Sequence, residues 1–273
     1  MNQLVDINML RYRADMTTAL SMTIPTSLGD VPLSADERGS GRPVLLLHGG
    51  AGPTSVTGFA DLLAERAGVR VIVPVHPGFG GTPRPDRLDS VRGLAELYDA
   101  LLDALGVEDA VVIGNSIGGW ITLELALRDP RRLARIVLVD AVGAEVEGHP
   151  VAGALPPDQL VQHSWYDPSK APNLDPATLP PAARELLAGN RSALQVYGGS
   201  MTDPSLLARL ADVTAPALVV WGEADRIADP DYGRALAAGI PGARFTLLPR
   251  TGHVPQVETP EALLDALRPF VTE

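Results

Sequence analysis

The sequence predicts an α/β fold in which a mostly parallel, twisted sheet is flanked by helices. Short apolar segments of strand length alternate with longer segments of helical periodicity as far as residue 139, which is the rhythm of repeated βα units. Several apolar segments end at a glycine-rich turn or an ionisable residue. From residue 142 to residue 212 the alternation stops, and we expect a helical cap inserted after the sixth strand.

The elements can be assigned in order along the chain. Residues 21–38 resemble an opening hairpin that turns at Leu28-Gly29-Asp30. Leucines at helical spacing, on one face of residues 88–105, indicate an amphipathic helix against the sheet. The remaining predicted elements are strands at 43–47, 69–73, 111–113, 135–139, 217–222 and 243–248 and a helix at 117–128.

The predicted domain organisation is a single core in two parts. Residues 1–141 and 213–273 form the core, and residues 142–212 form the cap. Eight prolines between residues 150 and 181 are expected to interrupt any long element there. A segment in this place would cover the catalytic edge of the sheet and shape the substrate pocket.

Composition indicates a globular enzyme and excludes some chemistry. The chain has 273 residues, 45% of them hydrophobic and 20% charged, which is ordinary for a folded domain. It has no cysteine, so disulfides, a thiol nucleophile and thiolate metal ligands are excluded. A net charge of −11 argues against nucleic acid and anionic membranes as partners.

Location and assembly are less constrained by the sequence. The first twenty residues lack the apolar core of a secretory signal, and no run approaches the roughly 18 apolar residues of a membrane helix. We therefore expect a cytoplasmic protein whose partner is a small-molecule substrate. A homodimer is left open by the sequence.

The segment around Ser116 is the most informative feature of the chain. Residues 111–120 read Val-Val-Ile-Gly-Asn-Ser-Ile-Gly-Gly-Trp, an apolar strand that runs into G-x-S-x-G and then a helix. The glycines leave room for a sharp turn that exposes the serine Oγ beside the free N–H groups of the helix start. Ser116 is therefore the candidate nucleophile.

Two further ionisable residues follow the ends of later strands. Asp225 comes after the strand at 217–222, and His253 comes after the strand at 243–248. Ligand sites of open parallel sheets lie beyond the carboxyl ends of the strands, so both side chains are expected near Ser116. His253 would accept the serine proton, and Asp225 would orient the imidazole.

Three other acids compete with Asp225 for this role. Glu223 and Asp229 flank it, and Asp140 closes the strand at 135–139. Asp229 precedes a proline and is interpreted as a helix cap. Asp140 cannot be excluded by strand-end position, although its place at the start of the insert suits a turn-capping role.

A glycine-rich loop after the strand at 43–47 supplies the next candidate. A tetrahedral intermediate needs two N–H donors, which we assign to Gly50 in this loop and to Ile117 after the nucleophile. His48 is interpreted as a structural residue that braces the loop. His76, in another loop rich in glycine and proline, is likewise not expected to take part directly in the chemistry.

Taken together, five motifs resemble those of the α/β-hydrolase superfamily, and the resemblance covers nearly the whole chain outside the insert. It implies a triad of Ser116, Asp225 and His253 and an oxyanion hole at Gly50 and Ile117. The motifs are His48-Gly49-Gly50, residues 76–82, residues 114–119, residues 222–225 and residues 252–255.

Within this superfamily, serine at position 116 differs from the aspartate of the haloalkane dehalogenase and epoxide hydrolase branches. Asn115 is similar to the meta-cleavage product hydrolases, which cut carbon–carbon bonds in vinylogous diketo acids. Those enzymes usually have tryptophan where this chain has Val254. They also carry a cap arginine for the substrate carboxylate, a place that Arg184 or Arg191 could fill.

The predicted function is a cofactor-independent serine hydrolase that acts on a small, largely apolar carboxylic ester or related acyl substrate through an acyl-enzyme on Ser116. A carbon–carbon bond hydrolase is the nearest alternative, and a non-hydrolytic catalyst or ligand-binding protein is an alternative of another class. No metal or cofactor is expected. The candidate substrate-binding residues are Trp120, Trp165, Tyr166, Arg191, Tyr197 and Val254, with Met201 as a further pocket wall.

Overall fold

A computed structural model describes residues 17–129, 132–153, 155–173, 175 and 177–273. Most of the N-terminal segment in which no secretory signal was found lies outside these residues. Among the described helices, none combines the length and apolar character that crossing a bilayer requires.

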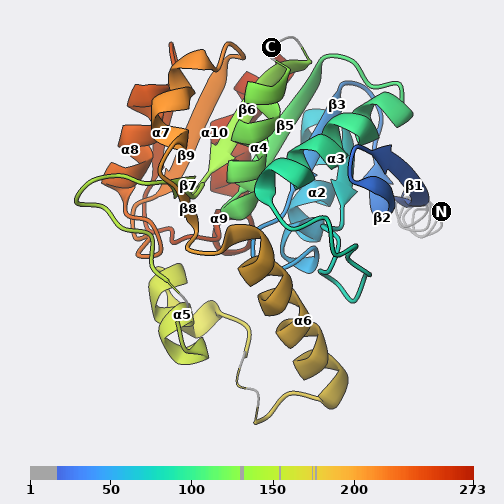
Figure 1. The fold of residues 1–273 in the computed structure, drawn as a ribbon. Coiled ribbons are helices and arrows are strands. Elements are labelled where there is room, and N and C mark those ends of the chain that lie inside the picture. Colours follow the sequence, from blue (N-terminus) through green and yellow to red (C-terminus); the bar gives the residue numbers. More distant parts are fainter. Residues whose placement is uncertain (1–16, 130–131, 154, 174, 176) are drawn as a thin grey trace, which may run out of the picture.

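The centre of the molecule is an eight-stranded sheet with the order β1-β2-β4-β3-β5-β6-β9-β10 (Figure 1). The pairs β1–β2 and β2–β4 are antiparallel, and the other neighbours are parallel. This confirms the predicted α/β-hydrolase fold class. The strands are β1 (Thr17–Thr26), β2 (Gly29–Arg38), β3 (Pro43–Leu47), β4 (Arg70–Pro74), β5 (Ala110–Asn115), β6 (Leu133–Val139), β9 (Ala217–Gly222) and β10 (Arg244–Leu248).

Helices cover both faces of the sheet and create two separate cores. One core contains residues of α3, α4 and α8, and the other contains residues of α2 and α10. In β3, Val44 and Leu46 enter one core while Leu45 and Leu47 enter the other, as the two-residue period of a strand buried on both sides requires. The helices are α2 (Thr54–Ala67), α3 (Val91–Ala104), α4 (Ile117–Arg128), α8 (Pro230–Gly239), α9 (Pro255–Glu258) and α10 (Pro260–Thr272).

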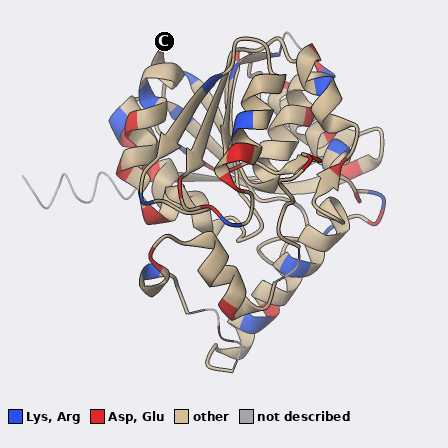
Figure 2. Cartoon of the chain, turned by 90° about the vertical axis from the view of Figure 1, so that its left-hand side faces the viewer, with Lys and Arg blue, Asp and Glu red and all other residues tan. Residues whose placement is uncertain are grey.

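Charged residues lie mainly on helices and loops, with acidic and basic residues interspersed (Figure 2). The central strands carry few of them, because both faces of the sheet are covered by apolar side chains.

The element boundaries differ from the predictions at two places. The opening hairpin pairs Thr26 with Gly29, so its turn is Ser27-Leu28, earlier than the predicted Leu28-Gly29-Asp30. The helix predicted at 88–105 begins at Val91, because the Ser90 side chain accepts a hydrogen bond from the N–H of Gly93 and caps the helix there.

The insert, defined here as residues 142–212, lies between β6 and β9 and contains two helices that project from the body of the protein (Figure 1). Prolines do not break these helices but stand at their first positions, where a missing N–H has no cost. An unbroken helix of 18 residues therefore forms where only short elements were expected. The elements are β7 (Gly143–Ala144), α5 (Pro157–Ser164), η1 (Pro168–Lys170), α6 (Pro181–Gly198), β8 (Thr202–Asp203), α7 (Leu206–Arg209) and η2 (Leu210–Asp212).

The turn between β5 and α4 is the tightest part of the core. Ser116 has φ 56° and ψ −120°, a conformation that a residue with a side chain rarely adopts. A side-chain carbon at Gly114 would lie 2.1 Å from the carbonyl oxygen of Gly118, and one at Gly118 would lie 2.4 Å from that of Leu47. Only glycine allows the strand, the turn and the helix to approach this closely.

From this packing we expect two glycine-to-alanine changes to have opposite effects on the free energy of unfolding. Gly118→Ala is expected to lower the free energy of unfolding by about 2 kcal/mol or more, because the new methyl group meets rigid backbone. Gly189→Ala, in an open position of α6, is expected to raise it by about 1 kcal/mol through helix propensity. Urea unfolding measures both, and equal stabilities would contradict the packing described here.

Candidate active site

Ser116, His253 and Asp225 meet at the carboxyl ends of β5, β10 and β9. The Ser116 Oγ lies 2.9 Å from the His253 Nε2, and the His253 Nδ1 lies 2.8 Å from the Asp225 Oδ2. All three residues are more than nine-tenths buried. The structure thus brings Ser116 together with two side chains that lie more than one hundred residues further along the sequence, in a serine–imidazole–carboxylate chain.

Backbone hydrogen bonds fix the Asp225 carboxylate on the side away from His253. Its Oδ1 accepts hydrogen bonds from the N–H groups of Ile227 and Ala228, at 2.8 and 3.2 Å. Its Oδ2 is then left to accept the proton on the His253 Nδ1. This arrangement leaves the Nε2 lone pair directed at the Ser116 hydroxyl, as general-base chemistry requires.

The other three acids have different positions. Glu223 accepts a hydrogen bond from the N–H of Arg250, away from the imidazole. Asp229 caps α8 through the N–H groups of Asp231 and Tyr232, as its position before a proline indicated. Asp140 is fully buried next to Asp225, and its Oδ1 accepts a hydrogen bond from the N–H of Gly222 at 2.8 Å.

The predicted oxyanion loop lies against Ser116. A side-chain carbon at Gly49 would lie 3.1 Å from the Ser116 Cβ, and one at Gly50 would lie 2.7 Å from the Leu194 Cδ2 of α6. The loop is therefore held between the nucleophile turn and the insert, and a side chain at Gly50 would require Leu194 to move. Ile117 follows Ser116 as the first residue of α4, so its N–H lies among the unpaired donors of a helix start.

Two buried histidines brace this loop. The His48 Nε2 accepts a hydrogen bond from the N–H of His76 at 3.2 Å, and its Nδ1 donates to the carbonyl of Gly49 at 2.8 Å. The His76 Nε2 donates to the carbonyl of His48 at 2.9 Å, and its Nδ1 accepts from the Tyr98 hydroxyl. Both rings are used for loop geometry, in agreement with the structural role inferred for them.

Burial keeps these two histidines neutral. It lowers the pKa of His48 from 6.5 to about 4, against a smaller opposite effect of its hydrogen bond to Gly49. It also lowers the pKa of His76 well below 6.5, and the nearby His48 adds to this effect. The two rings can therefore stack with their centroids 3.7 Å apart without charge repulsion.

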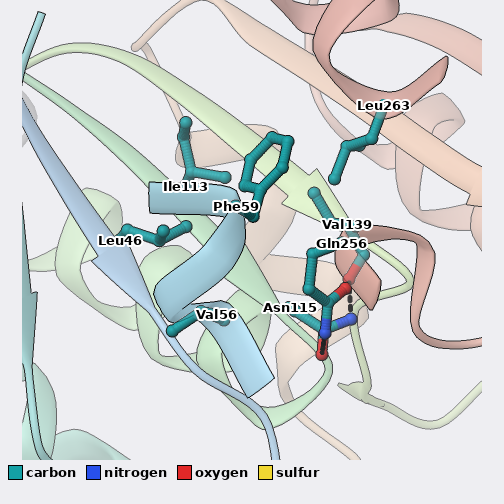
Figure 3. Close-up of a pocket in the computed structure, with 8 residues that line it drawn as sticks. All are labelled: Leu46, Val56, Phe59, Ile113, Asn115, Val139, Gln256 and Leu263. Carbon is teal, nitrogen blue, oxygen red and sulfur yellow. Dashed lines mark hydrogen bonds between the residues drawn. The ribbon is translucent and has the colours of Figure 1, made fainter. Parts of the chain in front are cut away.

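Asn115 supports the turn from behind and does not point along the serine–imidazole line. Its Nδ2 donates to the carbonyls of Val139 and His253, and its Oδ1 accepts from the Gln256 Nε2 at 3.0 Å. The two amides lie at one end of a small cavity between α2, the sheet and α9 (Figure 3). The cavity is otherwise apolar and is lined by Leu46, Val56, Phe59, Ile113, Val139 and Leu263.

The insert is attached to the His253 loop by several hydrogen bonds. The N–H of His253 donates to the carbonyl of Ser164 at 2.7 Å, at the end of α5. The Glu258 carboxylate accepts from the N–H groups of Tyr166, Asp167 and Gly252 at 3.2, 2.9 and 2.7 Å. Glu258 thus joins both segments. The sequence analysis missed this role because no local pattern relates residue 258 to residues 166 and 167.

Helix α6 presents neutral side chains to the loops around Ser116. The Asn190 Oδ1 accepts from the N–H of Gly80 at 2.9 Å, and the Tyr197 hydroxyl donates to the carbonyl of Pro77 at 2.8 Å. Leu194 contacts Gly50, and Ala193 lies over Gly78. Arg184 and Arg191, by contrast, are exposed. That Arg191 binds substrate stays a prediction.

The other predicted substrate-binding residues differ in how deeply they are buried. Trp120 and Tyr197 are buried, with Trp120 packed against Gly143. Trp165 and Val254 are partly buried. Tyr166 is 51% exposed, and its place in the wall of a pocket stays a prediction. Met201 lies against Gly198 of α6, near Ile117.

Among the residues that the structure describes, two groups of side chains have the composition of a metal site. Asp140, Asp225 and His253 place one ligand atom each within 4.8 Å of one another, as do His149, Asp229 and Asp231. In the first group the His253–Asp225 hydrogen bond already uses the ring nitrogen. In the second group His149 is paired with Asp229, which caps α8.

The fold and this arrangement at the strand ends define the α/β-hydrolase class. Residues 44–266 match the model of the alpha/beta hydrolase family. The chain belongs to this family, and its relatives are named as hydrolases.

Similar proteins of known activity span nearly the full chain. The chain is 29% identical to 2-hydroxy-6-oxo-6-phenylhexa-2,4-dienoate hydrolase of Burkholderia cepacia, over 91% of this chain and 94% of that protein. It is 31% identical to 2-hydroxymuconate semialdehyde hydrolase of Pseudomonas putida, over 87% and 89%. These are the carbon–carbon hydrolases with which Asn115 suggested a likeness.

Solved structures of both substrate classes share the fold. A meta-cleavage product hydrolase from Pseudomonas fluorescens superposes with a TM-score of 0.73 at 23% identity, over 91% of this chain and 96% of that chain. An esterase from Thermogutta terrifontis gives 0.73 at 24% identity, over 93% and 98%. The fold alone does not separate the two classes.

The buried His48 predicts a pH dependence of stability. The unfolded chain takes up a proton below about pH 6.5, whereas folded His48 remains neutral down to about pH 4. The free energy of unfolding should therefore fall as pH decreases through this window, by up to about 3 kcal/mol from His48. Urea unfolding at several pH values should show a smaller slope for His48→Gln than for the wild-type protein.

His163→Gln removes a histidine from the surface of α5 and is the matched control. It is expected to leave the wild-type slope in place. A His48→Gln protein with an unchanged slope would contradict the neutral, buried state of this ring.

Proposed function

We propose that this protein is a serine hydrolase in which Ser116 attacks the carbonyl carbon of the substrate. The observation that carries the proposal is the chain of contacts from the Ser116 Oγ to the His253 Nε2 and from the His253 Nδ1 to Asp225. A serine hydroxyl is a weak nucleophile by itself, and it needs a base in this position to accept its proton.

The proton would move along this chain in both halves of the reaction. His253 takes the hydroxyl proton as the Ser116 oxygen attacks, and the resulting imidazolium is stabilised by Asp225. His253 then gives the proton to the leaving group and later activates water against the acyl-enzyme. The N–H groups of Gly50 and Ile117 are the proposed donors to the carbonyl oxygen while it carries negative charge.

Our first candidate for the cleaved bond is a carbon–carbon bond next to a ketone. The support comes from the relatives, which are named for hydrolysis of 2-hydroxy-6-oxo-dienoates and of a semialdehyde. In such a molecule the 6-oxo group is the electrophile. Tautomerisation of the dienol, which moves its hydroxyl proton to C5, gives a 2-oxo group conjugated with the C3–C4 double bond, and this system accepts the electron pair when the C5–C6 bond breaks. His253 would then give the proton taken from Ser116 to the dienolate that leaves.

A second candidate is hydrolysis of a small neutral ester, and one observation favours it. A dienoate carries a carboxylate, which needs a cation or several hydrogen-bond donors when it is buried. The α6 residues next to the oxyanion loop are Asn190, Ala193, Leu194 and Tyr197, all neutral, and the two arginines of α6 are exposed. An apolar acyl group suits this surface better.

Covalent labelling tests whether Ser116 is the nucleophile. A fluorophosphonate probe should label one residue stoichiometrically, and Ser116→Ala should abolish labelling and lower kcat by at least about 10⁴-fold. Mass spectrometry of the labelled peptide identifies the site. Folded protein that is not labelled, or a Ser116→Ala variant that stays active, would favour a ligand-binding or non-hydrolytic role.

Two absorbance assays separate the two substrate classes. Loss of the visible absorbance of a ring-fission diketo acid reports carbon–carbon cleavage, and release of p-nitrophenol from the acetate or butyrate reports ester cleavage. We expect the larger kcat/KM on the diketo acid. A preference for the esters, with no turnover of the diketo acid, would establish the second candidate.

Arg191, one of the two exposed arginines of α6, gives a control for the same assay. Because Arg191 is exposed, Arg191→Ala is expected to leave KM for the diketo acid within about twofold of wild type. A tenfold or larger rise in this KM, with ester KM unchanged, would show that Arg191 reaches the substrate carboxylate.

A further inference from the structure

A second buried carboxyl group stands beside the proposed triad. Asp140 ends β6 with φ 46° and is completely buried. One oxygen of Asp140, one oxygen of Asp225 and one ring nitrogen of His253 lie within 4.8 Å of one another. The Asp140 Oδ1 accepts the N–H of Gly222, whereas the Oδ2 is buried without a hydrogen-bond donor among the described residues.

Two ionised carboxylates this close in a buried place would repel each other strongly, so one of them keeps its proton. The hydrogen bonds decide which one. Asp225 accepts from the N–H groups of Ile227 and Ala228 and from the His253 ring, and these donors stabilise its charge. Asp140 accepts from a single N–H, so the proton resides on Asp140.

The electrostatic surroundings agree with this assignment. Burial, followed by the negative charge of Asp225, raises the pKa of Asp140 well above its ordinary value. Glu258 adds to the rise, and the Gly222 N–H opposes it. The ionisable groups that face Asp140 are thus Asp225, His253 and Glu258. Of these groups, only His253 could supply a positive charge.

We propose that Asp140 is a positioning residue that donates a hydrogen bond from its protonated Oδ2 to the Asp225 carboxylate. This inference rests on the proposed function, because its effect is exerted through Asp225 on His253. The donated hydrogen bond holds the Asp225 carboxylate in place and withdraws charge from it. Without this donor, the more negative Asp225 would favour the protonated imidazole, which cannot accept the serine proton.

Two substitutions of similar size separate the hydrogen bond that Asp140 donates from the space that its side chain fills. Asp140→Asn keeps a neutral donor toward Asp225, and Asp140→Leu removes the donor. The readout is the second-order rate of Ser116 phosphonylation by the fluorophosphonate probe as a function of pH, which requires no knowledge of the substrate. Circular dichroism checks that each variant is folded.

We expect Asp140→Asn to react within about threefold of the wild-type rate, with the acidic limb of the pH profile unchanged. Asp140→Leu should react about 10- to 100-fold more slowly near pH 7, with the acidic limb moved to higher pH. Equal rates for all three proteins, or equal damage in both variants, would overturn the role of Asp140. Absence of labelling in the wild-type protein would instead overturn the proposed function.

Infrared spectroscopy detects the proton on Asp140 directly. It therefore tests the inference even if Asp140→Leu does not fold. The infrared difference spectrum of wild type minus Asp140→Asn at pH 7 should contain the C=O stretch of a protonated carboxylic acid. A spectrum with only carboxylate bands in its place would show that Asp140 is ionised, and it would overturn the inference whatever reaction the protein catalyses.

Discussion

The backbone conformation of Ser116 is the constraint on which the rest of the site depends. A positive φ angle at this residue turns the chain from β5 into α4 within one residue, and it leaves the Oγ at the carboxyl end of the sheet. The glycines at 114 and 118 are required for this turn, and the Asn115 amide connects it to Val139 and to the His253 loop. Strain in the turn is thus balanced by contacts with β6 and with the His253 loop.

Much of the architecture was predictable because it depends on local patterns. Strand segments buried on both faces, the helix start at Ile117 and the glycine-rich turn all leave a signature within a few residues. The meeting of Ser116, Asp225 and His253 was predictable for a different reason, since parallel strands bring their carboxyl ends to one edge of the sheet. Asp229 was recognised as a helix cap from the proline that follows it.

The parts that could not be predicted depend on contacts across the fold. Nothing near Asp140 in sequence shows that its Oδ2 lies buried beside Asp225, or that Asp225 receives more donors. The arginines of α6 were candidates because they carry the right charge, but the helix turns Asn190 and Leu194 toward the loops instead. The prolines of the insert were interpreted as breaks, and the structure uses them to begin helices.

The attachment of the insert limits how a substrate can enter. The α5 end is joined to the base-bearing loop through Ser164 and Glu258, so lifting that end would pull the imidazole away from the nucleophile. The α6 end rests on the glycine loops through Leu194, Ala193 and a few polar contacts. The two ends of the insert thus differ in what they hold: α5 holds the loop that carries the imidazole, and α6 holds the loops that surround the nucleophile.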